Sequence, residues 1–332
     1  MDLFIIIIFI VGLYTAWNIG ANDTANSVGT TVGSGVLTMR GALVRIVLFD
    51  TLGAVLFGHG VTKTIGGGIV DINILPDQLI IIGAFSVVLS AGIWLTLATW
   101  KGLPVSTTHS TVGAMLGFGL IAAGFDNIKW EVMQKIVASW VVSPVVGGIL
   151  AFILYTLLIK KLILTRTDNV KRVEKVFGYL QVSTAMYVGF AFGSNDVANA
   201  VGPIFMMLNR LGYDVNFNLL LGLGAFGIVL GAMTWGYKVI DTIGRRVTEI
   251  TPTRGFAAEF AAASVIIVNS LIGLPISTTH TVVGAVIGVG FARGVKALDL
   301  GIIYRIIGSW FLTVPAAALL TVVIFKVVVA LV

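Results

Sequence analysis

Long apolar runs alternate with short polar stretches along the whole chain. The runs that can cross a membrane cover about residues 3–20, 41–60, 79–100, 105–124 and 132–159, and then 178–195, 217–236, 255–272, 276–293 and 302–330. Most of them approach the length of about 20 residues that a helix needs to span a bilayer. The pattern therefore predicts an all-α polytopic membrane protein with about 10–12 transmembrane segments.

Two polar motifs interrupt this pattern, and each occurs twice. The stretch 20-GANDTANSVG-29 returns as 193-GSNDVANAVG-202, and 102-GLPVSTTHSTVGAMLGFG-119 returns as 273-GLPISTTHTVVGAVIGVG-290. The copies are separated by 173 and 171 residues, which indicates an internal duplication. We predict a first membrane repeat over residues 1–159, a basic linker over 160–177 and a second membrane repeat over 178–332.

The basic residues predict how the repeats are oriented. An odd number of crossings in each half makes the two copies antiparallel, that is, inverted in the membrane. With both termini outside and the linker in the cytoplasm, 16 of the 21 lysines and arginines fall in inside loops, as the positive-inside rule requires. Inverted repeats with interrupted helices are typical of secondary transporters.

Composition narrows the class of protein further. Hydrophobic residues make up 57% of the 332 residues and charged residues only 11%, whereas soluble domains carry roughly 25% charged residues. The chain has no cysteine, which excludes disulfides and thiolate chemistry. The N-terminal run lacks a basic segment and a cleavage site, so we expect it to be retained as the first helix.

Each ND motif places a carboxylate next to amides at membrane depth. Asp23 and Asp196 occupy matched positions, and intramembrane carboxylates are costly enough to be functional candidates. The neighbouring amides are Asn22, Asn26, Asn195 and Asn199. These side chains, with carbonyls that the flanking glycines would free if the helix unwound, are hard oxygen ligands suited to Na⁺. The competing interpretation is a polar contact between helices.

The GLP segments predict an anion site. Pro104 and Pro275 interrupt the chain, and Ser106 and Ser277 are suitable N-cap residues for the helices that follow. Helix N-termini offer free N–H groups and partial positive charge. Consecutive hydroxyls add donors at Ser106, Thr107, Thr108, Ser277, Thr278 and Thr279. In antiparallel repeats the two N-termini should face each other, although hydroxyls that bond back to the preceding turn are the alternative.

Two further carboxylates lie within other apolar runs. Asp50 and Glu259 are not related by the repeat spacing. Each is a candidate to ligate a cation, to relay a proton or to pair with the arginine five residues earlier, Arg45 or Arg254.

Together these motifs resemble the inorganic phosphate transporter (PiT) family over nearly the whole chain. GANDTANS and GSNDVANA are similar to its duplicated GANDVANA signature, and GLPVSTTH and GLPISTTH to its paired GLP-S-TH segments. The resemblance implies an inverted duplication with broken helices in which the STT segments belong to re-entrant hairpins. It also implies uptake of phosphate driven by a cation gradient, with no cofactor besides Na⁺ as coupling ion.

The resemblance also implies roles for individual residues. The expected Na⁺ ligands are Asp23, Asn26, Asp196, Asn199, Asp50 and Glu259, although Asp50 stands where the family commonly carries Glu. The expected phosphate contacts are Ser106, Thr107, Thr108, Ser277, Thr278, Thr279, Asn22 and Asn195. Bound cations would reverse the local field, so that cation and phosphate strengthen each other's binding.

Several alternatives stay open on the sequence alone. His109, His280 and Glu259 can carry protons, so H⁺ is a rival coupling ion. Sulfate is a rival substrate, and a passive anion channel is a rival class. An intramembrane enzyme would leave the STTH segments unused, so we expect no catalytic residues. The expected partners are phosphate, Na⁺ and the lipid of the plasma membrane, without nucleic acid, and the resemblance is compatible with a homodimer.

Overall fold

Helices form almost all of the described chain. The computed structural model describes residues 2–161, 163–237 and 249–331. Up to the linker the helices are α1 (Asp2–Gly33), α2 (Met39–Gly67), α3 (Asp77–Trp100), α4 (Thr107–Ala122) and α5 (Trp130–Ile153), which continues as a π-helix (Leu154–Lys161). After it come α6 (Val170–Arg210), α7 (Phe217–Trp235), α9 (Pro252–Leu271), α10 (Thr278–Phe291) and α11 (Leu300–Leu331). Short 3-10 turns lie at Ile72–Ile74, Phe125–Asn127, Leu164–Arg166 and Val295–Ala297.

The all-α membrane architecture predicted from the sequence is confirmed. Among the described residues seven helices are long and apolar enough to cross a membrane, namely α1, α2, α3, α5, α7, α9 and α11. Helices α4 and α10 have only 16 and 14 residues. At about 1.5 Å per residue they are shorter than the roughly 30 Å hydrocarbon layer. The segments 105–124 and 276–293 therefore contain helices that reach only part of the way across.

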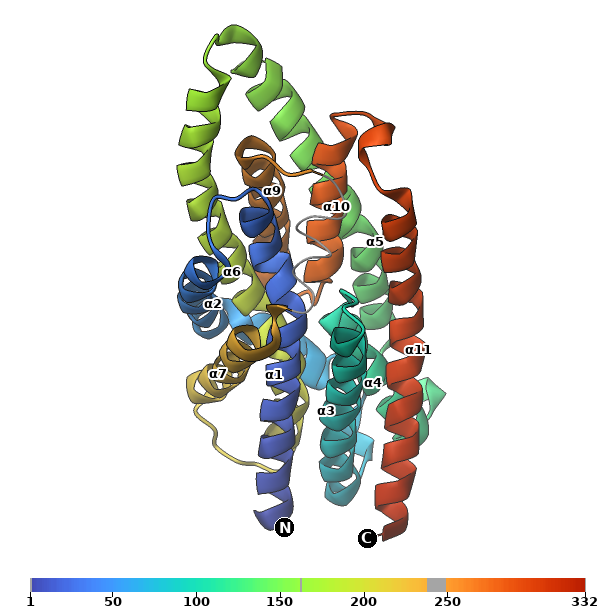
Figure 1. Cartoon of the computed structure of the whole chain (residues 1–332). Coiled ribbons are helices and arrows are strands. Elements are labelled where there is room, and N and C mark those ends of the chain that lie inside the picture. The colour runs from blue at the N-terminus through green and yellow to red at the C-terminus, as the bar shows by residue number, and fades with distance from the viewer. Residues whose placement is uncertain (1, 162, 238–248, 332) are drawn as a thin grey trace.

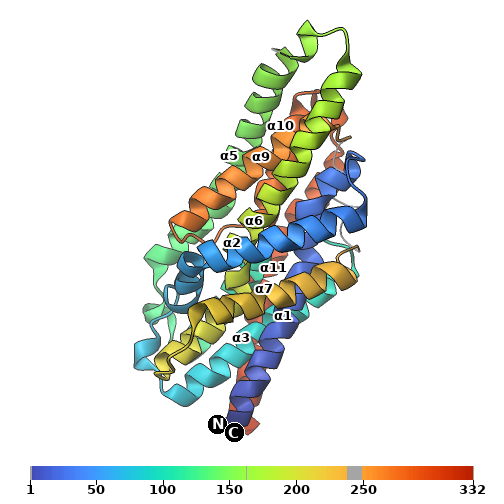
Figure 2. The same ribbon diagram turned by 90° about the vertical axis from the view of Figure 1, so that its left-hand side faces the viewer.

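The chain termini lie together at one end of the molecule, and the linker between α5 and α6 lies at the opposite end (Figures 1 and 2). Helix α1 runs from the terminal end toward the linker end, and α6 returns from the linker (Figure 1). Helices of the first half pack mainly on helices of the second half: α2 on α6, α1 on α7, α5 on α10 and α4 on α11. The core is therefore shared between the halves.

The ND motifs lie inside unbroken helices. Helix α1 continues through 20–29 to Gly33, and α6 continues through 193–202 to Arg210. The helices therefore do not unwind at the flanking glycines, and the carbonyls that unwinding would free stay within the helices. Instead, Gly20 and Gly193 let neighbouring helices approach, since a Cβ there would lie 1.8 Å from the carbonyl oxygens of Ile228 and Asp50.

The breaks occur at the GLP segments instead. Gly102 and Gly273 adopt φ of 65° and 70°, the left-handed conformation that ends α3 and α9. The chain then turns back into α4 and α10. The N-cap predictions are confirmed, because Ser106 Oγ and Ser277 Oγ each accept the backbone N–H three residues later at 3.1 Å. Each GLP segment thus joins two helices into a hairpin, as the family resemblance implies.

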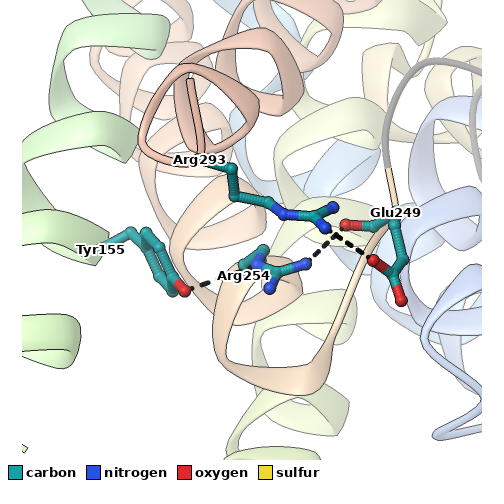
Figure 3. A network of polar contacts seen from close by, with 4 residues as sticks. All are labelled: Tyr155, Glu249, Arg254 and Arg293. Carbon is teal, nitrogen blue, oxygen red and sulfur yellow. Dashed lines mark hydrogen bonds and ion pairs between the residues drawn. The ribbon is translucent and has the colours of Figure 1, made fainter. Parts of the chain in front are cut away.

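A polar network ties the elements together near the linker end (Figure 3). Glu249 Oε2 pairs with Arg293 Nη2 at 2.9 Å, and its backbone carbonyl accepts from Arg254 Nη1 at 2.9 Å. The Arg254 Nε also donates to the Tyr155 hydroxyl at 3.4 Å (Figure 3). These contacts join the start of α9 to the end of α10 and to the π-helix. Three basic residues counted in the inside loops, Lys238, Arg245 and Arg246, lie outside the described residues.

Candidate functional site

The two hairpin tips meet in the interior of the molecule. Thr108 Oγ1, in the first turn of α4, donates to the carbonyl of Ile276 at 2.8 Å. In the matched contact Thr279 Oγ1, in the first turn of α10, donates to the carbonyl of Val105 at 3.1 Å. The N-termini of both helices therefore face one another, as the antiparallel arrangement predicted. All four residues are buried.

Asp23 forms the centre of one polar cluster. Thr107 Oγ1 donates to Asp23 Oδ2 at 2.8 Å, and Thr279 Oγ1 lies 3.3 Å from Oδ1. Asn26 Nδ2 donates both to Asp23 Oδ1 at 3.0 Å and to Thr279 Oγ1 at 2.9 Å. The carboxylate on α1 is thus held by hydroxyls from both hairpins.

Asp196 forms the centre of a matching cluster on α6. Thr278 Oγ1 donates to its carboxylate oxygens at 3.0 and 3.2 Å. Asn199 Nδ2 reaches across to Thr108 Oγ1 at 3.2 Å and to Thr107 Oγ1 at 3.4 Å. Each aspartate therefore contacts its own hairpin and each second asparagine contacts the other hairpin, and Asp23 also contacts the other hairpin through Thr279.

The two clusters adjoin one another. Asp23 and Asp196 line the same small cavity, of about 20 Å³, together with Asp50. A space of that size holds about one water molecule or one small ion. Two carboxylates this close repel each other unless a cation or a proton lies between them.

The first asparagine of each motif has a different environment. Asn22 Nδ2 donates to Thr99 Oγ1 at 2.9 Å and to the Leu103 carbonyl at 3.1 Å, and its Oδ1 accepts from Val105 N–H at 3.2 Å. Asn195 makes the matching contacts with Ser270 Oγ and the Leu274 carbonyl at 3.1 and 3.3 Å. Both amides therefore hold the broken chain of the hairpin, and Asn195 Oδ1 has no hydrogen-bond partner among the described residues.

Asp50 and Glu259 do not pair with the nearby arginines that the sequence suggested. Arg45 Nη1 donates to the carbonyl of Gly41 at 2.8 Å, and Arg254 belongs to the Glu249 network (Figure 3). Asp50 Oδ1 is buried without a hydrogen-bond partner among the described residues. Asp50 lines the small cavity from α2, and the apolar Ile228 of α7 is among the other residues that line it.

Glu259 is enclosed by neutral donors that sequence reasoning missed. Thr30 and Thr31 of α1 donate to its Oε1 at 2.5 and 2.7 Å, and Gln181 Nε2 donates at 3.0 Å. Thr184 Oγ1 donates to Oε2 at 2.6 Å. Polar residues continue along α1 after Asp23, and this pattern in the sequence could have indicated that Thr30 and Thr31 belong to a polar site.

This polar stripe on α1 has no equivalent in the other repeat. Toward the linker end α1 carries, in chain order, Thr24, Ser27, Thr30 and Thr31, and Ser34 follows in the turn after it. The residues 173 positions later on α6 are Val197, Ala200, Pro203, Ile204 and Met207. The α6 set is buried, as are the four α1 residues. It lies toward the terminal end, because α6 runs opposite to α1 (Figure 1). The site thus borders polar side chains on the linker side and packed apolar side chains on the terminal side.

The two motif histidines face away from the carboxylates. The His109 ring lies 3.7 Å from Trp140 and 4.4 Å from His280, and His280 stacks on Trp310 at 3.5 Å between ring centroids. Pro144 cannot donate to the carbonyl of Trp140 one turn earlier, and His280 Nδ1 lies 3.4 Å from that oxygen. His280 thus contacts the carbonyl that Pro144 leaves without its helical donor, which is a structural role.

Comparison with known proteins gives a consistent result. Residues 19–321 match the phosphate transporter family. The chain is 39% identical to a protein of Pyrococcus furiosus described as a predicted phosphate permease, over 98% of this chain and 96% of the relative. It is 37% identical to the chloroplastic inorganic phosphate transporter 2-1 of Arabidopsis thaliana, over 94% of this chain and 70% of the relative. A solved structure described as the sodium-dependent phosphate transporter is similar with a TM-score of 0.90 and 36% identity, covering 99% of this chain and 100% of the other.

Proposed function

The chain belongs to the phosphate transporter family, and we propose that it imports inorganic phosphate by symport with Na⁺. The observation that carries this proposal is the pair of matched clusters at the hairpin tips, in which Asp23 accepts from hydroxyls of both tips and Asp196 accepts from Thr278. A carboxylate surrounded by neutral oxygens provides a cation site, and two helix N-termini provide an anion site beside it.

The proposed cation ligands lie around the small cavity and beside it. Asp23, Asn26, Asp196, Asn199 and Asp50 supply oxygens near the centre, and Glu259 supplies a further site on the linker side. With Na⁺ between them, Asp23 and Asp196 no longer repel each other, and the site no longer repels a phosphate anion. Sodium and phosphate therefore strengthen each other's binding, and the effect is reciprocal.

Phosphate needs more room than the described conformation offers. The cavity of about 20 Å³ holds one small ion, and Thr108 and Thr279 are hydrogen-bonded to opposite hairpins. We propose that phosphate separates the tips and takes over the hydroxyl donors. The donors are Ser106, Thr107, Thr108, Ser277, Thr278 and Thr279. Asn22 and Asn195 border this position while they hold the hairpin breaks.

Uptake of radiolabelled phosphate into proteoliposomes tests the proposal. Wild-type protein should accumulate phosphate when a Na⁺ gradient is imposed at equal pH on both sides. Asp23→Asn and Asp196→Asn should each lose at least about 90% of this uptake, because removing a charged hydrogen-bond partner costs roughly 1.5–3 kcal/mol. Undiminished sodium-driven uptake in both variants would overturn the assignment.

The same vesicles separate the alternatives. Uptake driven by a pH gradient without Na⁺ would make the protein an H⁺ symporter. Strong competition by sulfate at equal concentration would indicate that the site takes sulfate, and would favour the alternative of a sulfate permease. Equilibration without accumulation would identify a channel.

We further propose two inverted repeats, residues 1–159 and 178–332, in a plasma membrane with the linker in the cytoplasm. The opposite placement of the linker and the termini supports this arrangement (Figure 1), and the excess of basic residues near the linker supports its direction.

A further inference from the structure

Each of the two short hairpin helices is packed tightly on a helix of the other half. A Cβ at Gly117 of α4 would lie 2.4 Å from the carbonyl oxygen of Ala318 of α11, and a Cβ at Gly288 of α10 would lie 2.1 Å from that of Gly148 of α5. Such close backbone contacts hold the two helices of each pair together. We call these units the α4–α11 pair and the α5–α10 pair, and each carries one hairpin tip.

The two pairs meet at the hairpin tips and, on the side away from the carboxylates, at a cluster of four rings. His109 of α4 lies 3.7 Å from Trp140 of α5 between ring centroids, and His280 of α10 lies 3.5 Å from Trp310 of α11. The two histidines lie 4.4 Å apart. Each of these ring contacts therefore joins one pair to the other. Over the described part of the chain, no helix of one pair packs along a helix of the other.

Behind the rings the two pairs are separated by an apolar groove. Its volume is about 1010 Å³, and helices of both pairs line it. The groove opens toward lipid, because Val141 of α5 and Phe311 of α11 line it and are 66% and 79% exposed. The backs of the two pairs can therefore approach each other by displacing lipid, without breaking a contact within the protein.

The ring contacts permit rotation in a way that the tip contacts do not. The indole Nε1 atoms of Trp140 and Trp310 are buried and have no hydrogen-bond partner among the residues that the structure describes, so packing of the rings holds these side chains. Aromatic pairs are stable in several relative orientations, whereas a hydrogen bond weakens steeply when its angle changes. The tips are joined by hydrogen bonds, which Thr108 and Thr279 donate to the opposite hairpin.

We propose that the four rings are the pivot on which the two pairs rotate when phosphate separates the hairpin tips. His109 and His280 are then positioning residues, because each directly follows a threonine whose hydroxyl phosphate takes over. This inference rests on the proposed function, in which phosphate breaks the contacts between the tips. Since the rings lie between the tips and the groove, a rotation that separates the tips brings the walls of the groove together.

Spin labels on the walls of the groove test this rotation. The chain has no cysteine, so Val141→Cys combined with Phe311→Cys places one label on each pair, and pulsed electron paramagnetic resonance measures their separation in lipid nanodiscs. Phosphate added in the presence of Na⁺ should shorten this separation by at least about 1–2 Å, the scale of small helix shifts. Val141→Cys combined with Phe291→Cys is the matched control. Phe291 is 48% exposed at the end of α10, so both labels lie on the α5–α10 pair and their separation should stay the same.

Substitutions in the labelled protein assign the rotation to the rings. The double variant Trp140→Leu, Trp310→Leu removes the ring contacts, and it should abolish the shortening and raise the KM for phosphate severalfold. Trp140→Phe, Trp310→Phe keeps a ring at each position and should retain the shortening. Phe325→Leu is the control for lost stability, because it removes a ring contact with Phe118 inside the α4–α11 pair, at 5.7 Å. It should lower the melting temperature and leave both the shortening and the KM unchanged.

The proposal and the proposed function fail in different ways. A separation that stays the same or lengthens with phosphate, in labelled protein that takes up phosphate, would overturn the pivot. Shortening that survives in the double leucine variant would overturn it too, as would an equal loss of shortening in Phe325→Leu. Absence of sodium-driven phosphate uptake in the protein before labelling would refute the proposed function, and with it this inference.

Discussion

At the scale of single residues, the two asparagines of each ND motif have separate roles. Asn26 bonds to Asp23 and to Thr279 of the opposite hairpin, whereas Asn22 holds the break in its own hairpin. We therefore expect Asn26→Ala to raise the KM for phosphate about tenfold and to lower the free energy of unfolding less than Asn22→Ala does, because Asp23 and Thr279 keep other hydrogen bonds. Asn22→Ala should instead lower the free energy of unfolding by about 1–3 kcal/mol. Uptake kinetics and thermal unfolding in detergent distinguish the two, and similar effects of both variants would contradict the division of roles.

Glu259 allows a second prediction at this scale. Thr30, Thr31, Gln181 and Thr184 all donate to its carboxylate, so Glu259→Gln replaces an acceptor by an N–H donor that faces other donors. Sodium-driven uptake should fall at least about tenfold, since a hydrogen bond to a charged group is worth roughly 1.5–3 kcal/mol. Glu249→Gln is the control, because its side chain is 70% exposed and exposed ion pairs contribute less than about 1 kcal/mol. Equal loss in both variants would rule out a specific role for Glu259.

At the scale of elements, the left-handed glycine that starts each hairpin break sets the position of the hydroxyls. Gly273 has φ 70°, and a Cβ there would lie 3.2 Å from the carbonyl oxygen of Gly60. Gly273→Ala should therefore displace the first turn of α10 and raise the KM for phosphate severalfold. Gly212→Ala is the matched control, since Gly212 has φ 73° with open space around its Cβ and lies in the same kind of turn after α6. Both variants carry the strain of a left-handed alanine, about 1–2 kcal/mol, so an equal rise in KM in both would mean that strain alone causes the effect.

Much of the site could be predicted from the sequence, because its strongest signals are local. The N-caps Ser106 and Ser277 follow from proline and serine at fixed spacing, and the structure confirms them. The environment of Glu259 could not be predicted, since Thr30 is 229 residues away in sequence. The role of Gly20 was also missed, because a glycine that breaks a helix and one that admits a neighbouring carbonyl have the same sequence pattern, and only the position of Ile228 distinguishes them.

At the scale of the whole molecule, the polar stripe on α1 and the apolar stripe on α6 make the two sides of the site unequal. The chain has no cysteine, so a single introduced cysteine reports accessibility without background. In Na⁺-free vesicles Ser34→Cys should react with a membrane-impermeant thiol reagent applied from the linker side. Met207→Cys should react at least about tenfold more slowly from the terminal side, since reaction there requires packed side chains to open. Equal rates from the two sides would contradict this asymmetry.

The glycine contacts have a consequence for how the protein is made. Carbonyl oxygens of α7 and α2 fit against Gly20 of α1 and Gly193 of α6, and the carbonyls of Val314 and Pro144 fit against Gly113 and Gly284 in the same way. Every one of these contacts joins a helix of the first half to a helix of the second. When only the first half has been inserted, the glycine faces of α1 and α4 therefore still lack the helices that pack against them. Final assembly in the membrane cannot be completed before α11 has left the translocon.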